Sequence, residues 1–341
     1  MKIFFRMLCA AAVVCIAAGA APAQSADFYA GKQMILIIGA DTGGGYDAQG
    51  RLMARHLGRF IPGNPNIIVQ NMPAAGSLVA ANALYTISPK DGTTIGFVQR
   101  GVLTAKITNP SGVHYAVDKF NWIGNLSTET GVVVAWHTAK VKTTDDLFKK
   151  EFIVGGSGPN IDTETSPRLL NALIGTKFKI VSGYKGTTDI ILAMERGEVE
   201  GLADWSWSNI QTRKPDFLRD HKIALLMQSA LQKEPDLPNV PLALDFAKNE
   251  TDRKVMQLFF SQKTAARPVL APPGVPADRV ALLRTAFMKM AADPQFKKDA
   301  KKSKLEIAPT SGEAVEKVVK LIASASPEMI ERLKDALAVK K

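Results

Sequence analysis

Cysteine is almost absent from this 341-residue chain, and the two that occur, Cys9 and Cys15, both lie in its first segment. Two cysteines exclude a disulfide-rich scaffold, a four-thiolate zinc site and an all-cysteine iron–sulfur site. The four histidines are scattered along the chain and form neither an HxxxH nor an HExxH pair. We therefore expect neither a metal nor a cofactor in this protein.

Long apolar runs are also missing after the first segment. The run from Met7 to Ala21 follows Lys2 and Arg6 and leads into a small-residue cleavage site at 21–23. It is shorter than the roughly 20 residues that span a bilayer, which favours a cleaved signal peptide over a membrane anchor. We place the signal peptide at residues 1–23, with 26 as the alternative end. Cleavage removes both cysteines and two positive charges, so the net charge falls from +11 to +9, and the mature chain is expected in the periplasm.

The motifs of several enzyme classes are missing as well. No Gly-Lys-Ser/Thr occurs, so there is no P-loop, and no G-x-S-x-G elbow occurs. Gly43, Gly45 and Ala48 formally match the dinucleotide fingerprint, but no acidic residue between Pro62 and Ser88 could hold the ribose. No nucleophile–base pair is identifiable by spacing. The sequence therefore offers no argument for catalysis, and a triad that only the fold brings together stays the alternative.

An alternation of short apolar runs and amphipathic helices occurs twice along the chain. The first series predicts strands at 34–39, 66–70 and 94–98 with helices at 46–60 and 78–87. The second predicts strands at 152–155, 178–182 and 199–203, again with a helix after each of the first two. This order is typical of a mainly parallel α/β sheet, so we expect two α/β units.

Two further apolar runs, at 131–136 and 223–228, suggest that the chain crosses between the units near 124–130 and returns near 227–232. We accordingly predict a discontinuous domain 1 (24–126 plus 230–341) and a domain 2 (127–229). Helices are expected at 242–260, 277–291, 312–323 and 328–338 in the tail. Two domains joined by two crossings predict a hinged molecule with a cleft between them.

The loops after the predicted strands are rich in glycine and small residues. Gly43, Gly44 and Gly45 lie between a buried strand and a helix start, where backbone N–H groups can approach an anion. A tight turn without a ligand is the alternative, but it needs fewer glycines. The run Ala74, Ala75, Gly76 and Ser77 repeats the arrangement, with Ser77 as either a helix N-cap or a ligand donor.

Equivalent loops occur in the second unit. Ser157-Gly158 and Tyr184-Lys185-Gly186 each follow a predicted strand and precede a helix. Because ligands of open α/β sheets bind at the carboxyl ends of the strands, we expect all four loops to converge on one cleft.

Four single residues near these loops allow two interpretations each. Arg100 could bind a carboxylate bidentately or form a surface salt bridge. Asp47 could complement the helix dipole, which we favour, or select a group on the ligand. Asp204 and Trp205 follow the last predicted strand and could form a cleft wall or simply alternate in burial. The lysines of 297–304 indicate a solvated helix face, and no nucleic-acid partner is expected.

Five stretches resemble the Bug-type solute receptors, the extracytoplasmic binding components of tripartite tricarboxylate transporters. They are LIIGADTGGGYDAQGRLMARHL (36–57), IIVQNMPAAGSLVAANALY (67–85), PKDGTTIGF (89–97), GYKGTTDIILAMERGEVEG (183–201) and LAPPGVPADRVALL (270–283). They occur in order over most of the mature chain. One departure is Ala74, which stands where the family often has glycine.

The resemblance implies a type II periplasmic-binding-protein fold, in which two α/β domains close around a small carboxylate. It implies that backbone donors of Thr42–Gly45 and Ala74–Ser77 hold one carboxylate, while the second-domain loops cover the rest of the ligand. The expected partners are a small organic carboxylate and integral-membrane transporter subunits, and the receptor is expected to be a monomer. A receptor that presents its ligand to a membrane sensor kinase is the alternative, followed by a secreted α/β enzyme.

Overall fold

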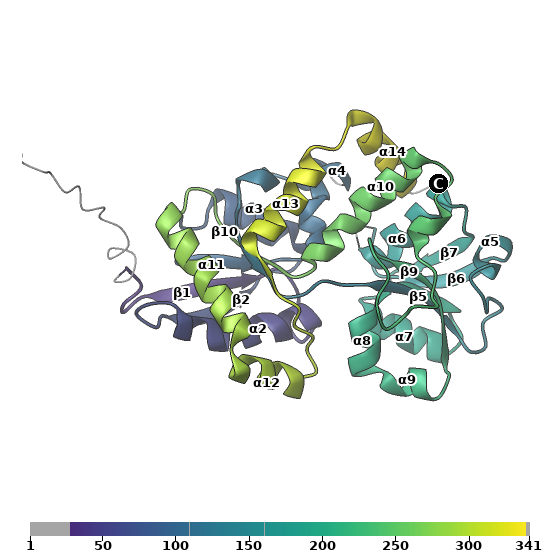
Figure 1. Cartoon of the computed structure of the whole chain (residues 1–341), viewed down its shortest axis with the longest axis horizontal. Helices are drawn as coiled ribbons and strands as arrows, with labels where there is room; N and C mark the ends of the chain where they lie inside the picture. Colours follow the sequence, from purple (N-terminus) through teal and green to yellow (C-terminus); the bar gives the residue numbers. More distant parts are fainter. Residues whose placement is uncertain (1–27, 109, 160, 339–341) are drawn as a thin grey trace, which may run out of the picture.

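The computed structural model describes residues 28–108, 110–159 and 161–338 and divides them between two β-sheets with helices on both faces (Figure 1). We call the first sheet with its helices lobe 1 and the second sheet with its helices lobe 2. The two α/β units predicted from the sequence are thus confirmed. The predicted signal peptide, residues 1–23, lies outside the described residues. Within those residues, no helix has the length and apolar character needed to cross a bilayer.

The sheet of lobe 1 is mixed. Its spatial order is β11 (Thr310–Ser311), β4 (Asn121–Asn125), β10 (Pro268–Ala271), β3 (Thr94–Phe97), β1 (Gln33–Ile38) and β2 (Asn66–Asn71). The strands β2, β1 and β3 are parallel, as their β–α–β order predicts. The strand β10 enters from far along the chain and pairs antiparallel with β3 and β4, so the sheet is less parallel than expected.

The sheet of lobe 2 repeats this plan. Its spatial order is β7 (Phe178–Ser182), β6 (Phe152–Gly156), β8 (Gly201–Ser206), β5 (Gly131–Trp136) and β9 (Ile223–Ser229). The strand β6 is parallel to β7 and β8, whereas β5 is antiparallel to β8 and β9. Each lobe therefore has three parallel strands, and most of the predicted site residues lie in the loops that follow them.

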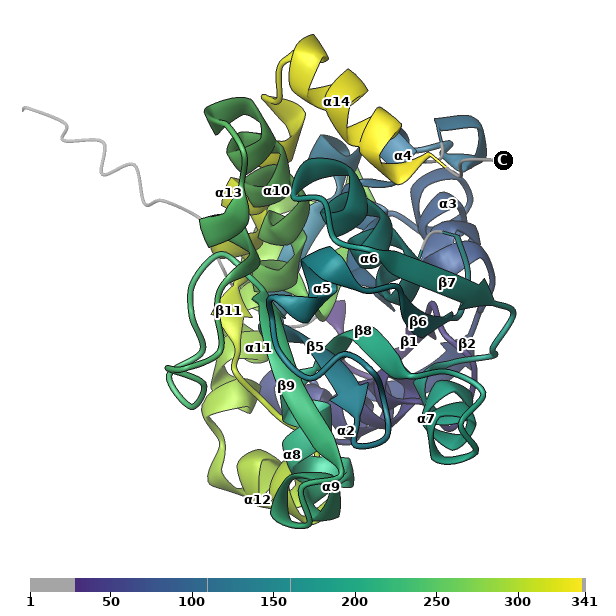
Figure 2. The ribbon, with the colours of Figure 1, turned by 90° about the vertical axis from the view of Figure 1, so that its right-hand side faces the viewer.

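Helices cover both faces of each sheet because the parallel strands are apolar on both sides. Lobe 1 carries α2 (Gly45–Leu57), α3 (Leu78–Thr86), α4 (Ala105–Thr108), α11 (Ala277–Ala292), α12 (Pro294–Lys302) and α13 (Gly312–Ala323). Lobe 2 carries α5 (Asp146–Lys149), α6 (Asp162–Leu173), α7 (Thr187–Glu195), α8 (Trp207–Arg213) and α9 (Pro215–Arg219). Figure 2 shows α6 on one side of the second sheet and α7, α8 and α9 on the other.

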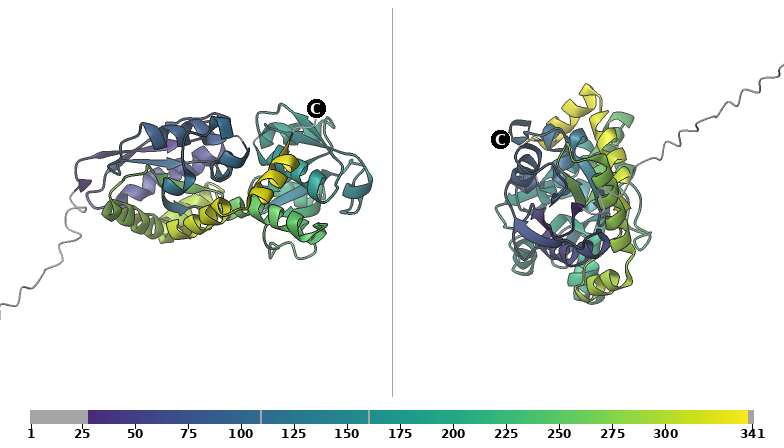
Figure 3. Two further views of the ribbon diagram at one scale, coloured as in Figure 1. Left: turned by 90° about the horizontal axis from the view of Figure 1, so that it is seen from above. Right: turned by 90° about the vertical axis from the view of Figure 1, so that its left-hand side faces the viewer.

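Two helices, α10 (Glu250–Ser261) and α14 (Pro327–Leu337), connect the lobes along one side. The helix α14 packs against α6 of lobe 2, α4 of lobe 1 and α10. A single apolar cluster runs through this layer, from Leu84 in α3 through Phe259 in α10 and Leu333 in α14 to Leu169 in α6. Seen from above, α13 lies on lobe 1 and α14 on lobe 2 (Figure 3). The lobes are therefore held together by apolar packing on this side.

The chain passes between the sheets over 126–130, from β4 to β5, and enters the first sheet again at β10. The segment after β9 still lies on lobe 2, because Leu237 and Val240 belong to its apolar cluster. The Gln228 amide donates hydrogen bonds to the carbonyls of both residues, at 2.8 and 2.7 Å. The division into 24–126 plus 230–341 and 127–229 thus stays a proposal, with residues 237–240 packing on the second unit.

Four of the tail helices, α10, α12, α13 and α14, begin at residues whose side chains cap them, whereas α11 follows Pro276 without a side-chain cap. Asn249, Asp293, Ser311 and Ser326 each accept a hydrogen bond from an amide three residues later. The helix α12 carries the lysines of 297–302, where the sequence indicated a solvated helix face. The short strand β10 was not predicted, since four apolar residues after a helix have no strand period of their own.

The packing of α11 on β4 depends on one aromatic ring. Phe287 is fully buried, and its ring lies so close to Gly124 that a side chain at that position would collide with it. We expect Phe287→Ala to lower the free energy of unfolding by about 3–5 kcal/mol. The neighbouring Met288 is 37% exposed, so Met288→Ala should cost less than about 1 kcal/mol. Urea unfolding followed by circular dichroism measures both, and equal losses would contradict this packing.

Candidate functional site

The loop between β1 and α2 provides no side-chain cap for the first turn of the helix. The N-cap residue of α2 is Gly44, which has no side chain to satisfy the amides of the first turn. Gly43 has a φ of +83°, a backbone conformation that glycine adopts without strain. Gly44 and Gly45 line a cavity of about 480 Å³ between the lobes, which we call the outer cavity. The predicted anion-binding loop therefore faces a cavity with its amide donors available.

Asp47 holds this loop in place. Its carboxylate accepts hydrogen bonds from the Gly43 amide, the Arg51 guanidinium and the Asn71 amide group, each at 2.9 Å. Burial alone would raise the pKa of Asp47, but the hydrogen bonds from Arg51, Gly43 and Asn71 outweigh it and hold the pKa below its usual value. Asp47 does not line the outer cavity, so its contacts are with the loop.

The second loop has an unusual backbone. Ala74, Ala75, Gly76 and Ser77 all have positive φ, and Ala74 reaches +105°. Such values are strained for alanine and serine and are maintained by surrounding contacts. Ser77 provides one, because its buried hydroxyl donates to the Gly39 carbonyl and accepts from the Gln99 amide at 2.9 Å. Its side chain therefore joins the loops after β1, β2 and β3 and does not cap α3.

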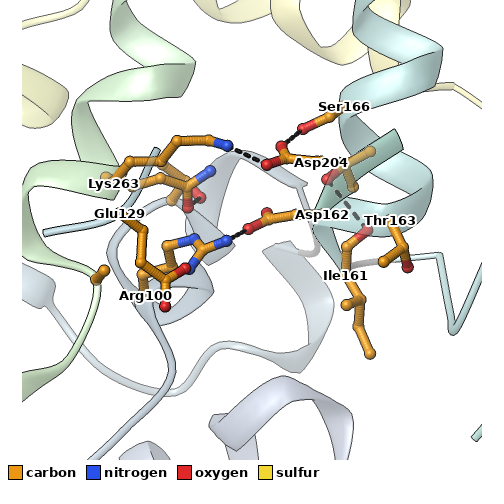
Figure 4. Close-up of polar contacts among 12 residues, drawn as sticks. Arg100, Glu129, Ile161, Asp162, Thr163, Ser166, Asp204 and Lys263 are labelled. Carbon is orange, nitrogen blue, oxygen red and sulfur yellow. Dashed lines mark hydrogen bonds and ion pairs between the residues drawn. The ribbon is translucent and has the colours of Figure 1, made fainter. Parts of the chain in front are cut away.

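Arg100 lies at the centre of a charged cluster between the lobes (Figure 4). It forms ion pairs with Glu129, in the connection between β4 and β5, and with Asp162, the first residue of α6. Glu129 also pairs with Arg267 at 2.6 Å. Burial would raise the pKa of Glu129, but Arg267 and Arg100 outweigh it and lower the pKa, so Glu129 stays ionised. Arg100 thus already binds two carboxylates of the protein itself.

A second ion pair lies beside the first. Asp204, at the end of β8 with a φ of +65°, pairs with Lys263 and accepts a hydrogen bond from Ser166 (Figure 4). Both charged side chains are almost completely buried, and burial lowers the pKa of Lys263. Gly131 lies directly against this pair, where any side chain would collide with Asp204. The pair connects β8 of lobe 2 with the segment that leads into β10 of lobe 1.

Two adjoining cavities lie beside these ion pairs, between the two lobes. The inner cavity, of about 170 Å³, is lined by residues that include Arg100, Asp162 and Asp204. The outer cavity includes Lys185 and Arg213 from lobe 2 opposite Gly44 and Gly45 from lobe 1. Both cavities share five residues, namely Tyr46, Thr187, Trp205, Asn209 and Arg267. Together they form one continuous cleft with walls from both lobes.

Tyr46 and Arg267 line both cavities. The Tyr46 hydroxyl donates to the Ala266 carbonyl at 2.7 Å, and the Arg267 guanidinium stacks on the Tyr46 ring at 3.9 Å from its centroid. Arg267 is only 8% exposed, and its Nε has no hydrogen-bond partner among the residues that the structure describes. The first turn of α2 is thereby attached to the segment that leads into β10.

About half of the predicted site residues line the cleft. These are Gly44, Gly45, Gly76, Arg100, Lys185, Gly186, Asp204 and Trp205. Ala75 lines a small neighbouring pocket that also contains Gly76. The remaining residues support the loops or lie beside them; they are Thr42, Gly43, Asp47, Ala74, Ser77, Ser157, Gly158 and Tyr184.

The loop after β6 illustrates this supporting role. The Ser157 amide donates to Thr163 Oγ1 at 3.0 Å, and the Gly158 amide donates to Glu164 Oε1 at 2.8 Å. These donors are already used within lobe 2. The residues that sequence reasoning missed are Glu129, Asp162, Arg213, Lys263 and Arg267. A charged residue directly before the apolar run of β10 was the one available signal, and it pointed to Arg267.

Two lobes of mixed α/β structure with a polar cleft between them define a periplasmic-binding-protein fold. Residues 53–334 match the model of the tripartite tricarboxylate transporter family receptor, and the chain belongs to this family. The resemblance found in the sequence is thereby confirmed. The family consists of transporter receptors, so the chain is a receptor rather than an enzyme.

Similar proteins support the fold. The periplasmic binding protein BugD has a TM-score of 0.67 and 18% identity, over 90% of this chain and 98% of that one. MatC from Rhodopseudomonas palustris, solved with bound malate, has a TM-score of 0.62 and 20% identity, over 90% and 99%. An Agrobacterium vitis protein, the UPF0065 protein in the TAR-I ttuE-ttuC' intergenic region, is 24% identical over 224 residues. That match covers 64% of this chain and 63% of the relative's length.

The contacts of Asp47 predict a pH-dependent contribution to stability. Asp47→Asn should lower the free energy of unfolding by about 1–3 kcal/mol at pH 7, because buried donors lose a charged acceptor. The pKa of Asp47 is lower in the folded than in the unfolded state. Its contribution is therefore present above the unfolded pKa of about 4 and is lost as the pH falls through the folded pKa. In unfolding curves measured from pH 7 to pH 3, the difference between the two proteins should become smaller as the pH falls below about 4. The exposed Asp118 provides the control substitution, and a gap that stays constant with pH would contradict this role.

The buried pair of Lys263 and Asp204 predicts a compensating double variant. Lys263→Met leaves a buried carboxylate without its cation and should cost about 3–5 kcal/mol of unfolding free energy. Adding Asp204→Asn removes that charge, and asparagine tolerates the positive φ of this position. Thermal and urea unfolding should show the double variant to be more stable than Lys263→Met alone. If it is equally or less stable, the loss does not come from an unpaired charge.

Proposed function

We propose that this receptor captures a small organic carboxylate between its lobes in the periplasm and delivers it to the membrane subunits of a tripartite tricarboxylate-type transporter. Membership of the receptor family and the malate bound by its relative MatC support this proposal. The predicted signal peptide supports export. The receptor is proposed to act as a monomer, because one chain supplies both walls of the cleft.

The observation that carries the proposal is the composition of the outer cavity. Lobe 1 contributes the uncapped first turn of α2, and lobe 2 contributes the cationic side chains of Lys185 and Arg213. A helix N-terminus and nearby cations both favour an anion. A Cβ placed on Gly45 would lie 3.5 Å from Arg213 Nη2, so the two lobes approach closely at this point. An anion bound here would contact both lobes at once.

A ligand that contacts both lobes favours their closed arrangement. Such a ligand binds the closed state more tightly than the open one and therefore shifts the population toward it. The apolar layer of α10 and α14 holds the lobes together on one side, so closure is expected about that side. A dissociation constant near ~1 μM requires about −8 kcal/mol, which a few charge-assisted hydrogen bonds and burial can supply.

The proposal predicts stabilisation by organic acids. At a ligand concentration 100 times the dissociation constant, unfolding should become about 2.7 kcal/mol less favourable, which raises Tm by several degrees. Thermal-shift screening of mono-, di- and tricarboxylates, followed by calorimetry on the compounds that stabilise the protein, measures this effect. The proposal fails if none of these anions shifts Tm or gives a binding isotherm up to millimolar concentration.

A variant at Gly45 separates binding from folding. A Cβ at this position would have only ordinary contacts with Arg213 and Arg267, so Gly45→Leu should fold while its side chain fills the outer cavity. We expect at least a tenfold loss of carboxylate affinity with Tm of the free protein nearly unchanged. Arg55→Leu, on an exposed part of the same helix outside the cleft, is the control and should bind normally.

A further inference from the structure

We infer that the ligand has one carboxylate, held in the outer cavity, and an uncharged or cationic hydrogen-bond donor, rather than a second carboxylate, at its inner end. This inference rests on the proposed function and specifies the class of ligand. It follows from a difference in charge between the two ends of the cleft. The outer cavity includes two cations without acidic partners in the described part of the chain, whereas both cations of the inner cavity are already paired with carboxylates of the protein.

The outer end of the cleft is strongly cationic. Its lining includes one carboxylate, Asp189, and four cations, Lys185, Arg213, Lys214 and Arg267. Lys214 has an acidic partner in Glu195, at 3.4 Å. Arg267 has one in Glu129, at 2.6 Å. The side chains of Lys185 and Arg213 have none among the residues that the structure describes. Two unpaired cations thus face the first turn of α2.

A buried side chain also points to an anion here. Arg267 stacks on Tyr46 in the first turn of α2, and its Nη2 lies 4.0 Å from the position of a Gly45 Cβ. It is more than nine-tenths buried, and its Nε has no hydrogen-bond partner in the described structure. The amides of Gly45 and Tyr46 and the Arg213 guanidinium therefore lie around one place for a single carboxylate, and Arg267, whose Nη2 pairs with Glu129, lies beside it.

The inner end has the opposite character. Three carboxylates line it, those of Glu129, Asp162 and Asp204, against the cations Arg100 and Arg267. Arg100 contacts Glu129 and Asp162 through its two terminal nitrogens, and Lys263 pairs with Asp204 from behind the cavity wall. A second ligand carboxylate would meet no free cation here and would repel Asp162.

A donor group, in contrast, would find acceptors in the inner cavity. Each carboxylate has about four lone-pair sites, and the ion pairs occupy only part of them. Asp162 is 16% exposed as a side chain and lies on the cavity surface. A hydroxyl, amide or ammonium group can therefore donate to it without displacing Arg100. The cavity of about 170 Å³ has room for a small polar group of this kind.

Ligands of matched length test this assignment on the full mature chain. Calorimetry would compare succinate with 4-hydroxybutanoate, 4-aminobutanoate and butanoate, and adipate with 6-hydroxyhexanoate and hexanoate. We expect the hydroxy or amino acid to bind at least about tenfold more tightly than the dicarboxylate of the same length, and more tightly than the plain acid. Tighter binding of the dicarboxylate overturns the inference but leaves the proposed function standing. If no compound of either class binds, the proposed function itself fails.

Asp162→Asn tests the residue that excludes the second carboxylate. Removing this charge should raise the affinity for the dicarboxylate relative to its hydroxy partner by at least about tenfold. The ratio of two affinities on one protein is independent of how the substitution changes lobe closure, because closure affects both ligands alike. Asp216→Asn, in α9 and outside both cavities, should leave the ratio unchanged. An unchanged ratio in Asp162→Asn would refute this assignment.

Arg213→Gln tests the outer end separately. Because all of these ligands place a carboxylate there, their affinities should fall in parallel, by about tenfold, with the ratio between classes retained. Arg219→Gln is the matched control, since this exposed last residue of α9 pairs with the neighbouring Asp220 and lies outside the cleft. A loss confined to dicarboxylates in Arg213→Gln would place the second carboxylate at Arg213 and overturn the inference.

Discussion

The structure depends on the requirement that charges buried between the lobes be paired. Glu129 lies in the connection from one sheet to the other, and Arg100 and Arg267 both contact it. These residues belong to the loop after β3, the crossing and the start of β10. Because an unpaired buried charge is costly, this cluster determines how the three segments lie relative to each other. It also decides which cations remain available to a ligand.

The lobes are joined differently on their two sides. On one side, the apolar cluster of α3, α10, α14 and α6 is continuous between the lobes. On the other, polar loops face each other across cavities that are lined from both lobes. Apolar packing is dense and tolerates small rearrangements without unpaired groups, whereas polar loops can exchange contacts with water or a ligand. This asymmetry suits a molecule that opens toward its polar side.

Much of the fold was predictable because its signals are local. The apolar runs of β1, β2 and β3, the glycines before α2 and the caps of the tail helices are each visible within a few residues. The mixed character of the first sheet was not predictable, because β10 inserts from a distant part of the chain. Among the site residues, the glycines and Arg100 were predictable because they follow predicted strands. Asp47 and Ser77 hold neighbouring loops in place, a role that neither interpretation of the sequence had named.

By itself, the sequence determined the two α/β units, the loops at the ends of their strands and the receptor family, because hydrophobic periodicity and glycine placement act locally. Only the tertiary structure decided the electrostatics of the cleft. Arg100 and Asp162 are paired, Lys263 is paired with Asp204, and Arg213 has no carboxylate partner among the described residues. The charges are all visible in the sequence, but their partners lie tens of residues away. Which charge is neutralised, and which remains for a ligand, depends on distances that only the folded chain defines.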